Sequence, residues 1–428
     1  MTSMFKPRNV LIFLICLVFV FSSLAQKNQS GEILSYTDPA IHTVQFYNEG
    51  WEFSLPVMEA GSSQRLILKF DELSGKTKSY SYTLVHCDSG WNQSRLMTSE
   101  YMDGFQENSL NDYAFSVNTT IPYVNYRLTL PNDQVKILVS GNYLLKVWDN
   151  TNKEKPALIR PFYVTEKLAE IAGGIGKAAY EGYNGASQQL AFTVNFIKLA
   201  ITDPLNEIST TVMQNFRGDM MHTKLRPTYI RQNQLVFEDN VNVFSGGNEF
   251  RNFNAKNLQT NGMGVHSIEY RDPYYHVYLE RDQSMQKEIY RYRDDLNGKY
   301  LVKNDRATDS DLESDYICVH FSLTPPDQVT NDLIYVFGSL SDWQCAPVNL
   351  MSYNPETKLY ELTLLLKQGF YDYQYVVFDK EKKNADPTFL EGSHMETEND
   401  YHLFVYYRGF SSRFDRLIGY RVINSVKR

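Results

Sequence analysis

The sequence predicts an all-β protein built from tandem β-sandwich domains, and three observations support this fold class. Apolar and aromatic residues alternate with polar ones in many short runs, which is the period-2 pattern of half-buried strands. Aromatic residues make up 14% of the chain, with 31 Tyr and 25 Phe, and such side chains pack well on a pleated sheet. Helical periodicity does not exceed two turns in any window, so we expect few helices.

The clearest strand pattern lies near the C-terminus, between residues 332 and 378. It predicts strands at 333–337, 360–366 and 371–378. Glycine and proline occur only between these runs, where turns need them. Trp343 lies in the first of these turns. The stretch therefore predicts a compact β-sandwich.

The same pattern extends back to residue 41 and divides the chain. Its 428 residues suggest two to four domains at roughly 100–200 residues each. The expected organisation is a polar lead-in at 26–40, an N-terminal β-sandwich domain at 41–166, a middle β domain at 167–310 and a C-terminal β-sandwich domain at 311–428.

Three segments of the middle part carry specific expectations. The glycine- and alanine-rich residues 169–185 are predicted to form a linker or loop. Asn297-Gly298 is predicted to turn a hairpin between strands at 289–293 and 299–302, because both residues tolerate positive φ. The acidic stretch 304–315 superficially resembles a calcium loop. It lacks the glycine and the closing glutamate of an EF-hand, so a solvated linker is favoured.

The first 25 residues have the features of a secretion signal. Lys6 and Arg8 precede an apolar run at 10–21, which is too short to cross a bilayer of about 30 Å as a helix. Ser23-Leu24-Ala25 resembles a cleavage site, so export with removal of 1–25 is expected, and an uncleaved anchor is the alternative. Cys16 lacks the preceding small residues of a lipoprotein signal.

The formal net charge of −8 becomes more negative when the leader is removed. An acidic protein is poorly suited to nucleic acid or to anionic lipid surfaces. Three cysteines remain after the leader: Cys87, Cys318 and Cys345. Cys318 and Cys345 could form a disulfide, but the interpretation that all three are small buried apolar residues is favoured.

No catalytic or metal-binding motif stands out in the sequence. The eight histidines are scattered singly, without HExxH spacing. There is no Gly-x-Ser-x-Gly elbow, and Gly246-Gly247 is followed by Asn248 rather than by the lysine of a phosphate loop. A carboxylate pair assembled by folding stays open. We therefore predict no enzymatic activity, no cofactor and no metal.

The last domain resembles the early-set, immunoglobulin-like modules that bind glycogen and starch. The similarity lies in a Val-Phe-Gly strand end, a turn with Trp343, a strand that begins with the motif Tyr-x-Tyr-x-Tyr and has Tyr375 as the last tyrosine of that motif, and Asp386-Pro387. In those modules, exposed aromatic rings stack on sugar faces, which would assign that role to Trp343 and Tyr375. The favoured alternative is that both rings pack in the core.

A closer resemblance covers nearly the whole chain after the leader. It is carried in order by 103–107, 126–130, 141–147, 294–298, 335–338 with Asp342-Trp343, 364–369, 390–394, 396–401 and 416–421. On these residues the chain is similar to the plug proteins of the type IX secretion system, an exported family of Bacteroidetes. The resemblance implies a protein with no catalytic role. The fold class expected from the strand patterns and the layout of the last domain is all-β, with tandem immunoglobulin-like, early-set β-sandwich domains.

The resemblance also implies a partner and a location. Plug proteins bind the periplasmic opening of a giant outer-membrane β-barrel translocon and close it when no substrate is engaged. Such a wide barrel is not filled by its own side chains. The expectation is a periplasmic protein at the inner side of the outer membrane, monomeric when free. A periplasmic carbohydrate-binding protein is the alternative.

The family provides no list of contact residues that can be transferred to this chain. Two segments are weak candidates for partner binding: the long loop between Trp91 and Asp112, and the basic C-terminal tail. The candidate side chains are Trp91, Tyr101, Phe105 and Arg416. Long loops in compact domains are usually either functional or well packed.

Overall fold

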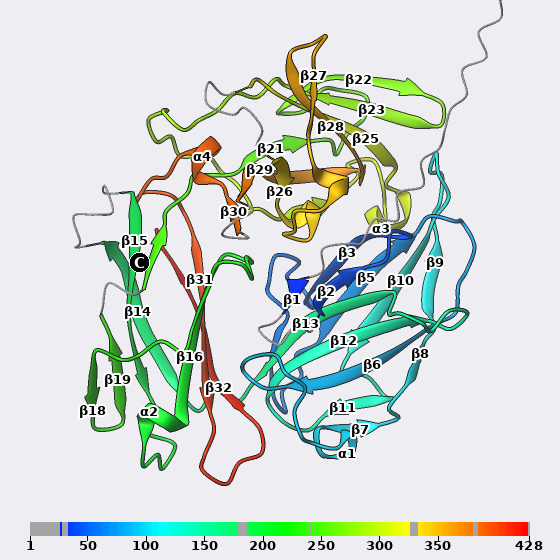
Figure 1. Ribbon diagram of the computed structural model, residues 1–428. Coiled ribbons are helices and arrows are strands. Elements are labelled where there is room, and N and C mark those ends of the chain that lie inside the picture. The colour runs from blue at the N-terminus through cyan, green and yellow to red at the C-terminus, as the bar shows by residue number, and fades with distance from the viewer. Residues whose placement is uncertain are drawn as a thin grey trace, which may run out of the picture.

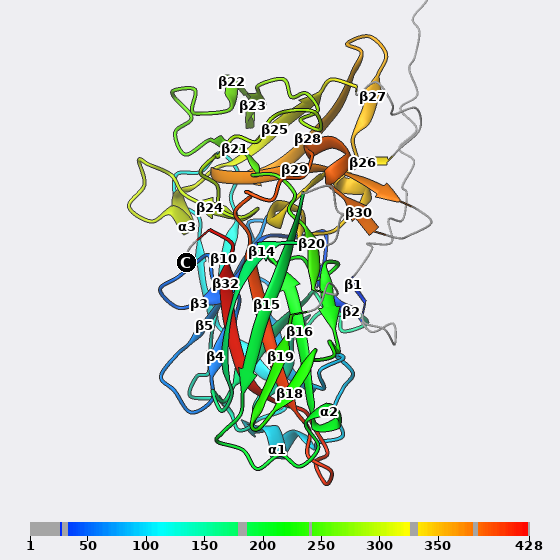
Figure 2. The same ribbon diagram turned by 90° about the vertical axis from the view of Figure 1, so that its left-hand side faces the viewer.

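The structure is a computed structural model that describes residues 26–27, 33–178, 186–238, 242–325, 333–379 and 384–426. The predicted leader at 1–25 lies outside the described residues. As predicted, the protein is nearly all β, and its sheets pack as β-sandwiches. Figure 1 shows three such units lying against one another. Figure 2 shows them in one elongated body. No helix in the described part of the chain is long and apolar enough to cross a membrane.

The first unit is a sandwich of two sheets. Its elements are β1 (Gln26–Lys27), β2 (Ile33–Thr37), β3 (Ile41–Asn48), β4 (Val57–Glu59), β5 (Leu66–Glu72), β6 (Tyr80–Cys87), α1 (Thr98–Tyr101), β7 (Met102–Gly104), β8 (Asn108–Leu110), β9 (Asp112–Phe115), β10 (Val124–Leu130), β11 (Val135–Ile137), β12 (Gly141–Asp149) and β13 (Leu158–Thr165). The larger sheet has the order β1-β2-β13-β12-β6-β8, with β4 beside β13. It packs against β3-β5-β10-β9. Burial alternates along β10, as its sequence predicts.

The second unit combines two distant parts of the chain. Its elements are β14 (Glu170–Lys177), β15 (Ser187–Asn195), α2 (Pro204–Glu207), β16 (Ile208–Gln214), β17 (Met221–Thr223), β18 (Tyr229–Arg231), β19 (Gln234–Phe237), β20 (Val243–Ser245), β31 (Asp400–Tyr407) and β32 (Arg416–Asn424). One sheet has the order β14-β15-β19-β18, with β20 beside β15, and the other has the order β17-β16-β31-β32. A shared apolar core lies between the two sheets.

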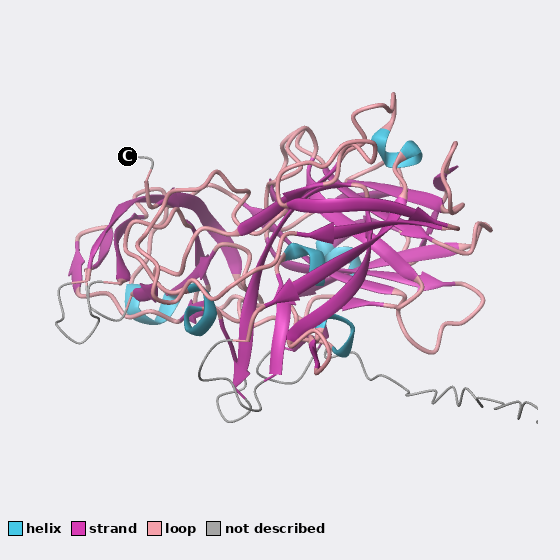
Figure 3. Ribbon diagram, turned by 90° about the horizontal axis from the view of Figure 1, so that it is seen from above, coloured by secondary structure: helices cyan, strands magenta, loops and turns pink. Residues whose placement is uncertain are grey.

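The third unit lies between these two parts in sequence. Its elements are β21 (Arg251–Asn254), β22 (Val265–Arg271), β23 (Tyr274–Leu279), β24 (Tyr300–Val302), α3 (Ser310–Glu313), β25 (Tyr316–Leu323), β26 (Leu333–Phe337), η2 (Ser339–Ser341), η3 (Pro347–Asn349), β27 (Ser352–Asn354), β28 (Leu359–Lys367), β29 (Gly369–Asp379), β30 (Asn384–Asp386) and α4 (Thr388–Glu391). One sheet is centred on β29, and the other has the order β22-β23-β25-β28-β27. The helices are single short turns beside the sheets (Figure 3).

The sheets do not divide the second half of the chain at 310/311, where the sequence predicted a boundary. Strands β21 to β24 lie before that point but pair with strands of the third unit. Strands β31 and β32 lie after it, and β31 pairs with β16 of the second unit. The third unit is thus an insertion in the second. Local alternation identifies a strand but not a pairing partner far away in the chain, because the buried face looks alike in either sheet.

Two local predictions are corrected. Residues 170–177 form β14, which pairs along its length with β15, rather than a loop. A Cβ on Gly173 would lie 2.4 Å from the carbonyl oxygen of Ala191, so glycine permits close backbone approach in the strand. The hairpin at Asn297-Gly298 is also absent. Both residues have positive φ, but 289–293 is not a strand and β24 pairs with β29 instead.

The acidic stretch 304–315 is an inter-unit contact rather than a solvated linker. Asp311 forms an ion pair with Lys69 of the first unit, with 2.5 Å between Oδ2 and Nζ. Asp315 accepts a hydrogen bond of 2.7 Å from the backbone N–H of Thr120. The sequence did not indicate these partners because they come from the first unit. The suggested disulfide between Cys318 and Cys345 is not formed, and Cys345 is buried.

The positive-φ turn is held by a buried carboxyl group on β29. Oδ2 of Asp372 accepts hydrogen bonds from the backbone N–H groups of Leu296 and Gly298. Its Oδ1 has no hydrogen-bond partner among the described residues. Burial, with a smaller contribution from the neighbouring charge of Asp295, raises the pKa of Asp372 to about 8. The folded protein therefore retains a proton there at neutral pH.

This raised pKa predicts a loss of stability as the pH rises. The pKa of Asp372 is higher in the folded protein than in the unfolded chain. Its contribution to the free energy of unfolding is therefore complete below about pH 4 and is lost as the pH passes through about 8. Between pH 5.5 and 8.5 the unfolding free energy should fall less in Asp372→Asn than in the unmodified protein, by about 3 kcal/mol. Urea unfolding at both pH values measures this. Equal pH dependence in both proteins would contradict it.

Candidate partner interface

Two of the four candidate partner-binding residues are buried in the first unit. Trp91 is 5% exposed, and its ring packs edge-on against Tyr163 with 5.2 Å between centroids. Tyr101 is 6% exposed, and its hydroxyl group donates a hydrogen bond of 3.0 Å to the carbonyl oxygen of Leu84. Neither ring is available to a partner. They anchor the long loop, which is well packed on this side.

Arg416 joins the first and second units. Its guanidinium forms a two-point ion pair with the carboxylate of Glu166, with Nε 3.0 Å from Oε1. The backbone N–H of Glu166 also donates to the carbonyl oxygen of Leu417 at 2.9 Å. Such two-point arginine contacts fix geometry. Arg416 therefore belongs to the internal joint of the molecule.

Phe105 is the candidate that is largely exposed, at 79%. It follows Gly104, which ends β7 with φ of 134°. A Cβ on Gly104 would lie 2.0 Å from the carbonyl oxygen of Gln134. Because glycine has no Cβ, the backbone at residue 104 can lie close to the chain at β11. The chain then turns away from β11, and the Phe105 side chain faces solvent.

The structure brings the long loop and the basic tail together. The guanidinium of Arg413 pairs with Glu100 in the loop. Just before the loop begins, the backbone N–H of Ser89 donates to Asp415 at 2.8 Å. Figures 1 and 2 place α1, α2 and the turn between β31 and β32 at one end of the molecule. We call this the lower end (residues 97–101, 204–207 and 408–415). Its exposed apolar side chains are Met97, Leu205 and Phe410.

A second exposed apolar surface was missed by the sequence analysis. Strand β9 is the last strand of its sheet, and Tyr113, Phe115 and Val117 are 46%, 53% and 48% exposed. We call residues 112–117 the β9 edge. The alternation of these three residues in the sequence was the available signal. It indicates a strand, but it does not reveal that the strand lies at a sheet edge.

The two rings proposed for sugar stacking are not arranged for that role. Trp343 packs edge-on against Phe250 and Phe337, with centroids 6.0 Å and 5.7 Å apart. Tyr375 is fully buried, and its hydroxyl group donates a hydrogen bond of 2.7 Å to the carboxylate of Asp282. Tyr375 therefore packs in the core, as the favoured expectation has it, whereas Trp343 is only partly buried and packs against an apolar cluster that includes Phe337.

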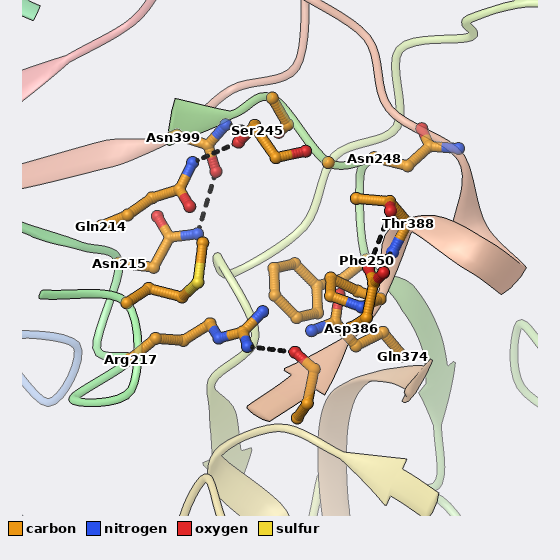
Figure 4. A pocket seen from close by; sticks show the side chains of 15 residues that line it. Gln214, Asn215, Arg217, Ser245, Asn248, Phe250, Gln374, Asp386, Thr388 and Asn399 are labelled. Carbon is orange, nitrogen blue, oxygen red and sulfur yellow. Dashed lines mark hydrogen bonds between the residues drawn. The ribbon is translucent and has the colours of Figure 1, made fainter. Parts of the chain in front are cut away.

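A pocket of about 270 Å³ lies between the second and third units (Figure 4). Arg217 lies on its wall and bonds to Asp219 and to the carbonyl oxygen of Ala385. Asn399 bonds to Asn215. These polar side chains mostly bond one another, so the pocket is a hydrogen-bonded seam between units. Within the described ranges, no group of three or more His, Cys, Asp or Glu residues could hold a metal ion.

Comparisons with known proteins give a family and a full-length structural relative. A family model described as "Type 9 secretion system plug protein 1st domain" matches residues 41–166. A crystal structure of a hypothetical protein from Parabacteroides merdae ATCC 43184 is 34% identical, with a TM-score of 0.88. The alignment covers 93% of this chain and 100% of that chain.

Two further solved structures resemble the chain only remotely. A marsupial T cell receptor is 9% identical with a TM-score of 0.16, and the alignment covers 89% of this chain and 99% of that chain. The dimeric latent PorU from Porphyromonas gingivalis is 7% identical with a TM-score of 0.15, with coverage of 90% and 34%. No curated protein matches the chain.

Proposed function

Because the chain belongs to the type IX secretion system plug family, we propose that it binds and seals the periplasmic opening of the giant outer-membrane β-barrel translocon. The observation that carries this proposal is the match of the family model to residues 41–166. The matched residues comprise the first sandwich from β3 to β13, without β1 and β2. In this proposal the protein acts by occupying space and not by catalysis.

The way in which the three units are joined supports a sealing role. An apolar cluster that includes Tyr163, Phe404 and Leu417 joins the first unit to the second. The buried ion pair of Asp71 and Lys367 joins the first unit to the third. A body that is already ordered loses little conformational entropy when it binds. It can therefore cover a wide aqueous opening without first having to fold onto it.

The proposed location is the periplasm, at the inner side of the outer membrane, with the protein monomeric when free. The predicted leader supports export. The lower end and the β9 edge are the candidate contact surfaces, because each exposes apolar side chains that a solvated monomer would otherwise leave uncovered.

Co-purification from native outer membranes tests the binding step. The tagged protein, extracted in mild detergent, is expected to recover a giant β-barrel in near-equal amount, identified by its mass. Recovery of the tagged protein alone, together with its retention on a glucan column, would contradict the plug function and favour sugar binding.

Permeability of intact cells tests the sealing step. Cells that lack the protein are expected to admit a large hydrophilic probe such as vancomycin, since an unfilled large barrel is an aqueous channel. Re-expression of the unmodified chain should restore exclusion. The same probe uptake with and without the protein would contradict sealing even if the barrel co-purifies.

A further inference from the structure

The β9 edge is an incomplete side of the first sandwich. Strand β8 lies at the edge of the larger sheet and pairs with β6. The chain then passes directly into β9, at the edge of the smaller sheet, which pairs with β10. One continuous strand region therefore forms the border of both sheets. An exposed strand at such a border is a template for pairing with another chain.

The backbone of β9 has hydrogen-bonding groups that point outward. The N–H of Ser116 donates to the carbonyl oxygen of Tyr123 on the β10 side at 2.9 Å. Alternate residues of a strand direct their N–H and C=O groups to the same side. The N–H and C=O groups of Tyr113 and Phe115 therefore point away from β10. No described residue supplies them with a hydrogen-bond partner.

The side chains at this edge lie in the row that continues the buried core. Tyr113 lies opposite Tyr126, and Phe115 lies opposite Val124, in the register of the two strands. Tyr126 and Val124 are fully buried, whereas Tyr113 and Phe115 are about half exposed. The Tyr113 ring still contacts the Tyr126 ring, with centroids 5.7 Å apart. The core row thus extends to the edge but lacks a cover there.

One end of the same edge already accepts a segment from elsewhere. Val117 is two residues beyond Phe115, and its N–H donates to the carbonyl oxygen of Leu312 in the third unit at 2.9 Å. The edge is therefore continuous with an established interface between units. At its other end, Asp112 is exposed. Arg127 of β10 lies opposite Asp112 in the register, but no ion pair joins Asp112 to any described residue, so its carboxylate stays accessible. A basic side chain on an added segment would find a partner there.

We propose that the β9 edge binds an extended segment of the translocon by strand addition. This inference rests on the proposed plug function and deepens it by naming the contact. The segment carries apolar residues at alternate positions, which cover Tyr113 and Phe115, and a basic residue that faces Asp112. Main-chain hydrogen bonds to the outward groups of Tyr113 and Phe115 provide affinity, and the alternate side chains provide selectivity.

Substitution at the edge tests the proposal in the full chain. Phe115→Lys places a charge in the row of side chains, with Tyr113, that the added strand must cover. It is expected to reduce the amount of barrel that co-purifies at least about tenfold. Ile230→Lys is the matched control, because Ile230 is 50% exposed on β18, an edge strand of the second unit. It should leave recovery unchanged. Thermal unfolding verifies that both variants fold.

Hydrogen exchange of the unmodified protein provides a second measurement that does not depend on a variant. The amides of Tyr113 and Phe115 are expected to exchange more slowly in the complex with the purified barrel than in the free protein. Side-chain contact without strand addition would leave these two amides unprotected, and that result would overturn the inference.

The outcomes separate the inference from the function on which it rests. If the unmodified protein and Phe115→Lys recover the barrel equally, or if Ile230→Lys weakens recovery as much, strand addition at β9 is wrong and the plug function stands. If the unmodified protein recovers no barrel, both are wrong. Selective loss with Phe115→Lys, together with protection of the two amides, supports both.

Discussion

Replacement of Lys367 by methionine is expected to destabilise the folded protein by about 3–5 kcal/mol, because it leaves a buried carboxylate without its partner. Nζ of Lys367 lies 2.6 Å from Oδ2 of Asp71, and the two side chains are 1% and 0% exposed. Methionine preserves much of the aliphatic volume, so the main change is the loss of charge. Urea unfolding at neutral pH measures the difference.

This ion pair is part of the joint between the first and third units. Tyr316 of the third unit also donates its hydroxyl to Asp71 at 2.7 Å. Lys367 donates a further hydrogen bond to the carbonyl oxygen of Asp311, and its ammonium lies 4.1 Å from the centroid of the Tyr123 ring. The joint is therefore a connected polar network, and loss of one member affects the others.

Two further variants distinguish an unpaired charge from lost packing. The double variant Asp71→Asn with Lys367→Met removes both charges and is expected to regain part of the lost stability. Lys153→Met is the surface control, since its ion pair with Glu107 is 48% exposed on both sides. It should change stability by no more than about 0.5 kcal/mol. A double variant as unstable as Lys367→Met alone would contradict the charge explanation.

The strands of this fold could be predicted from sequence because their signal is local. The predicted strand at 333–337 coincides with β26, and its short continuous apolar run is typical of a strand that is buried on both faces. The pairing could not be predicted in the same way. β31 pairs with β16, almost two hundred residues earlier, and no local property of either strand indicates the other. The inserted third unit was therefore divided at the wrong place.

Amino-acid composition gave a wrong prediction of secondary structure where glycine lies inside a strand. The glycines of 170–177 suggested a loop, since glycine weakens strands in general. In the structure, the backbone of Ala191 passes so close to Gly173 that a Cβ has no space. The requirement comes from the neighbouring strand and is visible only when the two are paired.

The candidate contact residues show the same limit. Residue type marked Trp91, Tyr101 and Phe105 as possible contacts, but it does not reveal which face of a sandwich a ring occupies. Trp91 and Tyr101 are buried, and Phe105 is exposed. Tyr113 and Phe115 became candidates only when sheet order placed β9 at an edge. The position of a surface depends on tertiary pairing, which the sequence pattern does not contain.

The second large effect is expected at Arg251, inside the third unit. Arg251 is 5% exposed, and its Nε lies 3.1 Å and 3.0 Å from the two carboxylate oxygens of Glu391. Its Nη1 lies 2.6 Å from Oδ1 of Asp282. Arg251→Met leaves two carboxylates without their shared cation. We expect a loss of about 3–5 kcal/mol in unfolding free energy, measured by urea unfolding.

The lysine variant separates charge from geometry at this site. Arg251→Lys keeps the positive charge but cannot contact Glu391 and Asp282 at once with a planar fork. It is therefore expected to lose about 1–3 kcal/mol, less than the methionine variant. Arg271→Met is the matched control in the same unit, because the pair of Arg271 with Glu269 is at least half exposed. It should cost less than about 1 kcal/mol.

Arg251 lies near the point where the inserted third unit rejoins the second unit, so its loss tests whether the third unit can unfold separately. Glu391 lies at the end of α4, where the chain leaves the third unit to complete the second. Its Oε1 also accepts a hydrogen bond from the backbone N–H of Tyr375 at 2.7 Å. Loss of Arg251 should therefore accelerate hydrogen exchange in β29 and α4 before it affects the first unit. Equal acceleration in all three units would instead indicate that the insertion does not unfold separately from its host.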